Sequence, residues 1–257
     1  MNKLRPGQGW QILTAIILWT VVILVYGPAA LQKYNGEAQG ATEHASNVVA
    51  PVPLTSPSDV SYVAVGDSYT IGTGTTPDHS WPAALTRELR HKGIKIENTG
   101  NLGVDGFTTQ QAIDQELPLF ESAKPTFATL MIGVNDTYNP TTPDQFHSEL
   151  VQLLDRMQAV MPNKENLILV TIPDYSVTPT GAQFARMNNA TAKISQFNDI
   201  IRSEGTKRGL PVVDVYPSSL QMGTDSRLRA GDNLHPSVKE YTRWEKLIYP
   251  TAYRMLR

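Results

Sequence analysis

The sequence predicts an α/β domain in which helices cover both faces of a parallel β-sheet. From Ser61 onward, short and continuous apolar runs alternate with amphipathic stretches. Strands buried on both faces are apolar along their whole length, and parallel strands need crossover connections that are usually helical. Because no internal repeat is found, we expect one domain of about 200 residues, spanning residues 59–257.

Five apolar runs are the predicted strands. They are SYVAVG (61–66), KIENTG (95–100), TFATLMIG (126–133), NLILVTI (166–172) and PVVDVY (211–216). Between them, helices are predicted to start near Trp81, Thr108, Thr142 and Gln183, and a last helix follows Pro236. In open sheets of this kind, ligands bind beyond the carboxyl ends of the strands, so we expect a functional site there.

Composition excludes several classes of function. The net charge of −2 gives no sign of the basic face that nucleic-acid binders carry, so no nucleic-acid partner is expected. The chain has no cysteine, which excludes disulfides, thiolate metal sites, a cysteine nucleophile and a lipid-modified N-terminal cysteine. No histidine-rich ligand spacing is present, so we expect neither a metal nor another cofactor.

The N-terminus predicts a membrane segment. Lys3 and Arg5 precede a stretch without charge that continues to Lys33. Within this stretch, residues 10–31 are apolar enough and long enough for a signal anchor. The preceding positive charges would leave residues 1–9 in the cytoplasm and the rest of the chain outside it. A signal peptide cleaved near the sequence GPAAL would instead give a secreted protein, and a buried core helix is a third interpretation. Residues 32–58 lack periodicity and are rich in small and polar residues, which indicates a flexible linker.

The first strand ends at Gly66, Asp67 and Ser68. Either polar side chain can cap a following helix by accepting hydrogen bonds from free amide groups. The alternative is that Ser68 is a nucleophile at the edge of the sheet. The tripeptide alone does not decide between them.

The next two strand ends offer hydrogen-bond donors. Residues 98–109 contain glycines at 100, 103 and 106, which form a loop and leave backbone N–H groups unobstructed. Asn135 and Asp136 follow the third strand, where such residues commonly form turns. A side-chain amide at this place can also donate to an oxyanion.

The loop before the last helix contains Asp232 and His235. Their spacing lets the carboxylate orient the imidazole, although a turn residue and a helix start would explain the same residues. Acyl transfer by serine needs a nucleophile, a base, a group that orients the base and donors for the tetrahedral oxygen. Ser68, His235, Asp232 and the donor loops together supply all four.

These blocks resemble, in order, those of the SGNH (GDSL) hydrolases. The matching residues are Gly66-Asp67-Ser68-Tyr69, Asn101 with Gly106, Gly133 with Asn135-Asp136, and Asp232 with His235. The resemblance extends over residues 60–250 and implies a three-layer α/β/α sandwich with a five-stranded, mainly parallel sheet. Tyr69 departs from the family pattern, which has leucine there, and we expect this to affect the pocket wall rather than the mechanism.

The resemblance also implies roles for individual residues. Ser68 is the expected nucleophile, His235 the general base and Asp232 the residue that orients it. The expected oxyanion hole combines the N–H groups of Ser68 and Gly106 with the side-chain amide of Asn135. The expected activity is hydrolysis of a carboxylic ester through an acyl-enzyme.

The substrate is left open by the sequence. An O-acyl sugar, a lysophospholipid and a short acyl ester all fit, as does transfer of the acyl group to a cell-envelope sugar, and a non-catalytic envelope-binding module is a further alternative. Aromatic residues near the strand ends are candidates for the pocket wall, together with residues 173–184. They are Tyr69, Phe107, Tyr138 and Tyr175. The oligomeric state is not predicted.

Overall fold

The computed structural model describes residues 60–257, apart from the side chains of residues 186–188. The predicted cytoplasmic segment (1–9), membrane anchor (10–31) and linker (32–58) lie outside the described residues and stay predictions. Within residues 60–257, no helix combines the length and the hydrophobicity needed to cross a bilayer.

Five strands form one parallel sheet in the order β2-β1-β3-β4-β5. Their bounds are β1 Val60–Gly66, β2 Ile96–Asn101, β3 Phe127–Met131, β4 Leu167–Val170 and β5 Val212–Val213. Each coincides with one of the five predicted runs, although β1 begins one residue before its run and β2 ends one residue after its run. β5 is shorter than its run because the backbone leaves the sheet after Val213, where Asp214 and the N–H of Val215 both bond to the Thr171 hydroxyl.

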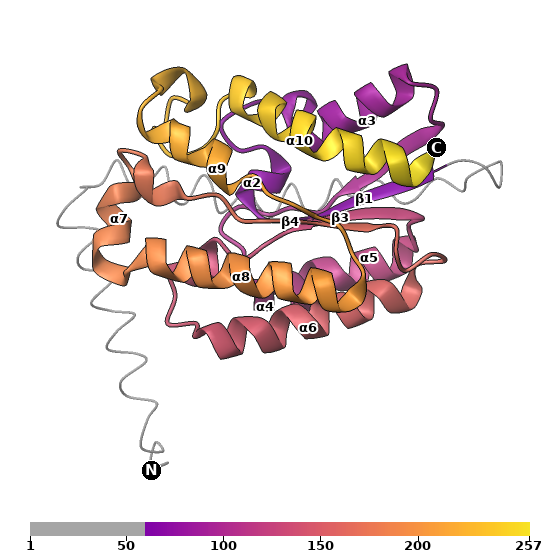
Figure 1. The fold of residues 1–257 in the computed structure, drawn as a ribbon, viewed down its shortest axis with the longest axis horizontal. Coiled ribbons are helices and arrows are strands. Elements are labelled where there is room, and N and C mark those ends of the chain that lie inside the picture. The colour runs from indigo at the N-terminus through magenta and orange to yellow at the C-terminus, as the bar shows by residue number, and fades with distance from the viewer. Residues whose placement is uncertain (1–59) are drawn as a thin grey trace, which may run out of the picture. The chain divides into compact units, whose positions relative to one another are not determined.

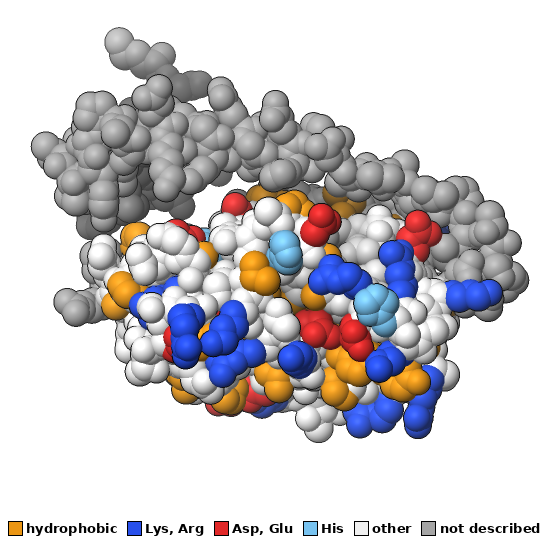
Figure 2. Space-filling view, turned by 90° about the horizontal axis from the view of Figure 1, so that it is seen from above, with side chains coloured by type: hydrophobic (Ala, Val, Ile, Leu, Met, Phe, Trp, Pro, Cys, Tyr) orange, Lys and Arg blue, Asp and Glu red, His pale blue; other side chains and the backbone are white. Residues whose placement is uncertain are grey.

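Helices cover both faces of the sheet, which confirms the three-layer arrangement (Figure 1). One layer contains α3 (Trp81–His91) and α10 (Val238–Leu256), which pack against each other. The other contains α5 (Leu117–Ala123), α6 (Pro143–Val160) and α8 (Ala190–Arg208). Figure 2 looks onto the first layer and shows basic and acidic side chains interspersed, so neither sign of charge dominates this face.

The predicted helix starts agree closely with the structure. Ser80 caps α3, Thr142 caps α6, and Thr108 caps α4 (Thr109–Gln111) through a capping box with Gln111. Side chains that accept hydrogen bonds from the first amides of a helix fix where it begins.

One predicted helix is two in the structure. α7 (Gly181–Asn188) begins two residues before Gln183. It is terminated by Asn189, whose φ of 50° is left-handed, and α8 begins at the next residue. A left-handed residue ends a helix, and asparagine adopts this conformation more readily than most residues.

Short elements occupy the carboxyl ends of the strands. The α-helices here are α2 (Ser68–Ile71) and α9 (Tyr216–Ser219), and a π-helix, η2 (Ala112–Glu116), follows α4. The 3₁₀-helices are η1 Pro77–His79, η3 Asn135–Thr137, η4 Tyr175–Val177, η5 Leu220–Gly223 and η6 Ser226–Leu228. These connections contain the four predicted motifs.

Candidate active site

The turn after β1 satisfies both interpretations of its sequence. Asp67 is the N-cap of α2, and its side chain accepts a hydrogen bond of 3.0 Å from the N–H of Tyr69. Ser68 is the first residue of α2, so its hydroxyl is not needed for capping and points elsewhere. Gly66 allows the turn to lie close to β3, because a Cβ there would be 2.2 Å from the carbonyl oxygen of Met131.

Ser68, His235 and Asp232 form a hydrogen-bonded row. Nε2 of His235 lies 3.1 Å from the Ser68 hydroxyl, and Nδ1 lies 2.7 Å from Oδ2 of Asp232. The other carboxylate oxygen of Asp232 accepts from the backbone N–H groups of Leu234 and His235. Partial burial alone would raise the pKa of Asp232, but these hydrogen bonds outweigh it and lower the pKa to about 2. The carboxylate is therefore ionised at neutral pH.

Close backbone contacts set the distance between the serine turn and the histidine loop. Gly74 has a φ of +94°, and a Cβ on it would lie 2.6 Å from the Cβ of Ala230 and 3.2 Å from that of His235. The same loop also contacts Thr180, whose N–H donates to the carbonyl oxygen of Asn233 and whose hydroxyl donates to that of Asp232. The loop is thus held between the serine turn and the segment that precedes α7.

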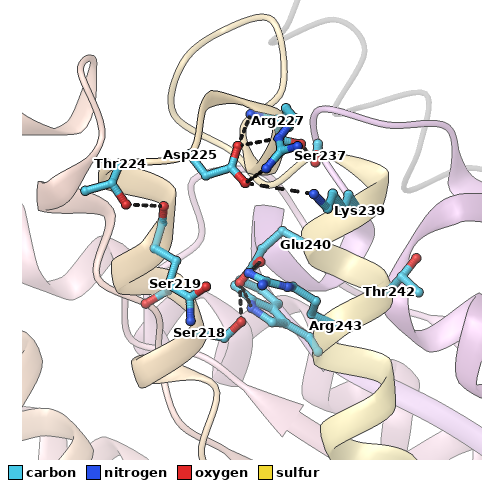
Figure 3. A network of polar contacts seen from close by, with 12 residues as sticks. Ser218, Ser219, Thr224, Asp225, Arg227, Ser237, Lys239, Glu240, Thr242 and Arg243 are labelled. Carbon is cyan, nitrogen blue, oxygen red and sulfur yellow. Dashed lines mark hydrogen bonds and ion pairs between the residues drawn. The ribbon is translucent and has the colours of Figure 1, made fainter.

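Helix α10 supports the histidine through buried aromatic rings. The Tyr69 ring lies 5.3 Å from the His235 ring and 6.0 Å from Trp244, measured between centroids. Nε1 of Trp244 donates to the buried carboxylate of Glu240, which also accepts a hydrogen bond of 2.6 Å from Ser218 on α9. Figure 3 shows Glu240 between Ser218 and Arg243.

A second set of contacts in the same view ties the start of α10 to the loop. Asp225 pairs with Arg227 and with Lys239, and the Ser237 hydroxyl donates to the Arg227 carbonyl oxygen (Figure 3). These ion pairs are largely exposed, so we attribute the position of the loop mainly to the buried contacts.

The predicted oxyanion donors come from neighbouring segments. Nδ2 of Asn135 donates to the carbonyl oxygen of Phe107 at 2.9 Å, which brings the amide within one residue of Gly106. Gly106 has a φ of +79° and open space where a Cβ would be. Among the described residues, the N–H groups of Ser68 and Gly106 have no acceptor. An oxyanion hole requires donors that are not already paired.

Gly103, in the same loop, has a separate role. A Cβ there would lie 2.8 Å from both the carbonyl oxygen of Asp67 and the N–H nitrogen of Ile71. Only glycine therefore lets this loop pack against the turn that carries Ser68.

The predicted pocket aromatics are divided between two places. Tyr138 stacks on Tyr175 with 4.4 Å between ring centroids, and Phe184 of α7 meets Tyr138 edge-on at 6.0 Å. The Tyr175 hydroxyl lies 3.0 Å from that of Thr137, beside Asn135. Tyr69 instead lies against His235. Phe107 is half-buried, and its backbone carbonyl makes the contact with Asn135. Burial raises the pKa of Tyr138 and of Tyr175, so both are neutral phenols.

Two buried acids near the site were not singled out as functional from the sequence. Glu116 ends the π-helix and accepts a 3.0 Å hydrogen bond from the N–H of Gly66. Asp136 accepts from the N–H and the hydroxyl of Thr109. The only sign in the sequence that Glu116 is buried is that this acid stands among apolar residues at helical spacing. These residues, Ile113, Leu117 and Phe120, are all buried in the structure. In residues 60–257 no group of three acidic or histidine side chains could hold a metal ion.

Comparisons with known proteins agree on one family. The family model described as "GDSL-like Lipase/Acylhydrolase family" matches residues 64–243. A lipase/acylhydrolase from Enterococcus faecalis is 21% identical with a TM-score of 0.63, and the match covers 77% of this chain and 97% of that one. An acetylxylan esterase from Geobacillus stearothermophilus is 18% identical with a TM-score of 0.57, covering 77% and 94%. At these identities the likeness establishes a shared fold. No match was found among curated protein sequences.

Proposed function

The chain belongs to the GDSL-like lipase/acylhydrolase family of serine ester hydrolases, and from that premise we propose that it cleaves a carboxylic ester through an acyl-enzyme on Ser68. The observation that carries the proposal is the row of hydrogen bonds from Ser68 through His235 to Asp232. A base within hydrogen-bond reach of a hydroxyl can remove its proton as the oxygen attacks a carbonyl carbon.

Each residue has one role in the proposed cycle. His235 takes the proton of Ser68 and returns it to the departing alcohol, while ionised Asp232 stabilises the imidazolium that forms. The N–H groups of Ser68 and Gly106 and the amide of Asn135 bind the oxyanion. Water activated by His235 then releases the acid and restores Ser68.

The proposed substrate is a small lipid or carbohydrate ester. Tyr138 and Tyr175, with Phe184 at their edge, supply apolar surface beside Asn135 for the acyl or sugar group. The Tyr69 ring packs against the His235 ring. We assign the pocket wall to these residues rather than to the Phe107 side chain.

A covalent probe tests the nucleophile, and an ester panel tests the substrate. A fluorophosphonate should label the wild-type chain and the Ser148→Ala control, whose serine is exposed on α6, but not Ser68→Ala. Full hydrolysis by Ser68→Ala would refute the assignment.

Acyl esters of increasing length, tested beside an acetylated polysaccharide, then identify the class of substrate. Added sugar acceptors that become acylated would point to transfer instead of hydrolysis.

We propose that the hydrolase domain lies outside the cytoplasm, with residues 10–31 as a membrane anchor. The support is the order of positive charge, apolar segment and polar linker in the sequence. Reporter fusions at the C-terminus that are active only in the cytoplasm would contradict this topology. The size of the mature chain separates an anchor from a cleaved signal peptide.

A further inference from the structure

Two fully buried carboxyl groups lie directly under the turn that carries Ser68. Asp67 immediately precedes the nucleophile and is 0% exposed, and Glu116 is 1% exposed. Each uses one oxygen to accept a backbone N–H of the turn: Asp67 from Tyr69 and Glu116 from Gly66. The two acids thus hold the backbone on both sides of Ser68.

The second oxygen of each group has no partner. Oδ2 of Asp67 and Oε1 of Glu116 are buried and make no hydrogen bond with the described residues. An ionised carboxylate would leave part of its charge on this unsolvated oxygen, which is strongly unfavourable. A protonated carboxyl instead carries its hydrogen there and leaves the other oxygen free to accept the backbone N–H.

No cation compensates these groups. Within residues 60–257, neither acid forms an ion pair with a lysine, arginine or histidine. The titratable groups whose charges act on Asp67 are all carboxyls or phenols. They are Asp105 in the loop after β2, Glu116 of η2, Asp136 of η3, Tyr138 directly after η3, Tyr69 of α2 and Tyr241 of α10. Asp136 itself faces Glu149 of α6.

We propose that Asp67 and Glu116 are positioning residues that act as neutral, protonated acids, and that ionisation of Asp67 in alkaline solution displaces the turn that carries Ser68. Burial, with the nearby acids adding to it, raises the pKa of Asp67 to about 8. Burial also holds the pKa of Glu116 well above its ordinary value. The predicted effect of Asp67 ionisation on catalysis rests on the proposed function. The prediction that Asp67 and Glu116 stay protonated in the folded chain does not.

Proton release on unfolding tests the buried protons without any variant. In the unfolded chain both carboxyls titrate near pH 4, so at pH 7.5 unfolding should free them. Unfolding the full-length chain by urea in weak buffer, followed with an indicator dye, should release one to two protons per chain. Release of none would overturn the proposal.

The pH profile tests the link to the site. In wild-type protein, kcat/KM should fall roughly tenfold or more between pH 8 and 9.5, as expected when one ionisation inactivates the enzyme. In Asp67→Asn, whose amide oxygen can still accept from Tyr69, the profile relative to its own maximum should stay level over this range. The control is Asp114→Asn, which removes an exposed acid from η2, the π-helix that carries Glu116. Its kcat/KM should fall between pH 8 and 9.5 as that of the wild type does.

The two proposals fail in different ways. If Asp67→Asn loses activity at alkaline pH as wild type does, the positioning role is wrong even though Ser68-dependent hydrolysis persists. If Ser68→Ala hydrolyses esters normally while unfolding still releases the protons, the proposed function is wrong and the buried neutral acids remain.

Discussion

His235 Nε2 lies 3.1 Å from the hydroxyl of Ser68, although 167 positions separate the two residues in the chain. This distance is already within the range for proton transfer. The site is thus assembled by the fold itself, through the contacts of Gly74, Tyr69 and Thr180 with the histidine loop.

Asp232→Asn should lower kcat by about 10²- to 10⁴-fold with little change in KM, because a neutral amide stabilises the imidazolium poorly. Steady-state kinetics on one ester checks this, with Asp199→Asn, which changes an exposed acid of α8, as the control. Because the pKa of Asp232 is about 2, its carboxylate is lost only as pH falls through that value. Protonation of Asp232 should therefore cause no loss of wild-type activity above pH 4. A kcat within threefold of wild type would contradict its role.

Asn135→Ala should reduce kcat by about 10²- to 10³-fold, as expected for the loss of one oxyanion donor. The variant also loses the hydrogen bond to Phe107, so circular dichroism must show an intact fold. Asn163→Ala, in an exposed turn, is the matched control. An unchanged kcat would remove Asn135 from the oxyanion hole.

Gly103→Ala should abolish most activity and lower the melting temperature, because the added methyl lies 2.8 Å from backbone atoms of the serine turn. Gly100→Ala should be tolerated, because the three nearest atoms to its added methyl lie at ordinary contact distances of 3.5–3.8 Å. Equal behaviour of the two variants in activity and thermal unfolding would show that the close approach of this loop is unimportant.

Glu204 provides a test of stability away from the site. It is buried on α8, and hydrogen bonds from His147, Arg208 and Lys207 outweigh its burial and lower its pKa to about 2. Because the folded-state pKa is lowered, these hydrogen bonds stabilise the fold fully at pH values above the ordinary pKa of a glutamate, and the stabilisation is lost as the pH falls through about 2. By linkage it is on the order of 3 kcal/mol.

Glu204→Gln should therefore lower the free energy of unfolding by about 2–3 kcal/mol at pH 7. The difference from wild type should shrink as the pH approaches 2, in urea titrations at each pH. Glu165→Gln, an exposed acid after α6, serves as the control. A difference that does not depend on pH would show that Glu204 acts through packing alone.

The sequence predicted the elements whose signals are local. Apolar runs located all five strands. The helix starts predicted near Trp81, Thr108 and Thr142 are correct because the side chains of Ser80, Thr108 and Thr142 bond to amides a few residues away. The resemblance of ordered motifs grouped Ser68, Asp232 and His235, which the structure brings into contact.

Other features depend on tertiary contacts that no local pattern reveals. Glu116 reaches Gly66 because a π-helix turns it inward, and the break at Asn189 depends on a single left-handed residue. Likewise, Trp244 belongs to the site only because α10 folds back against Tyr69. Such contacts join distant parts of the chain, so their spacing in the sequence gives no sign of them.

The support that α10 gives to Tyr69 has a consequence for synthesis of the chain. Trp244 and Tyr241 contact residues near Ser68, and Tyr241 donates to the carbonyl oxygen of Thr73. A chain emerging from the ribosome therefore exposes its serine long before the helix that supports its base. We therefore expect no esterase activity from a nascent chain until His235 and the first turns of α10, which carry Tyr241 and Trp244, have been translated and have packed against the serine turn.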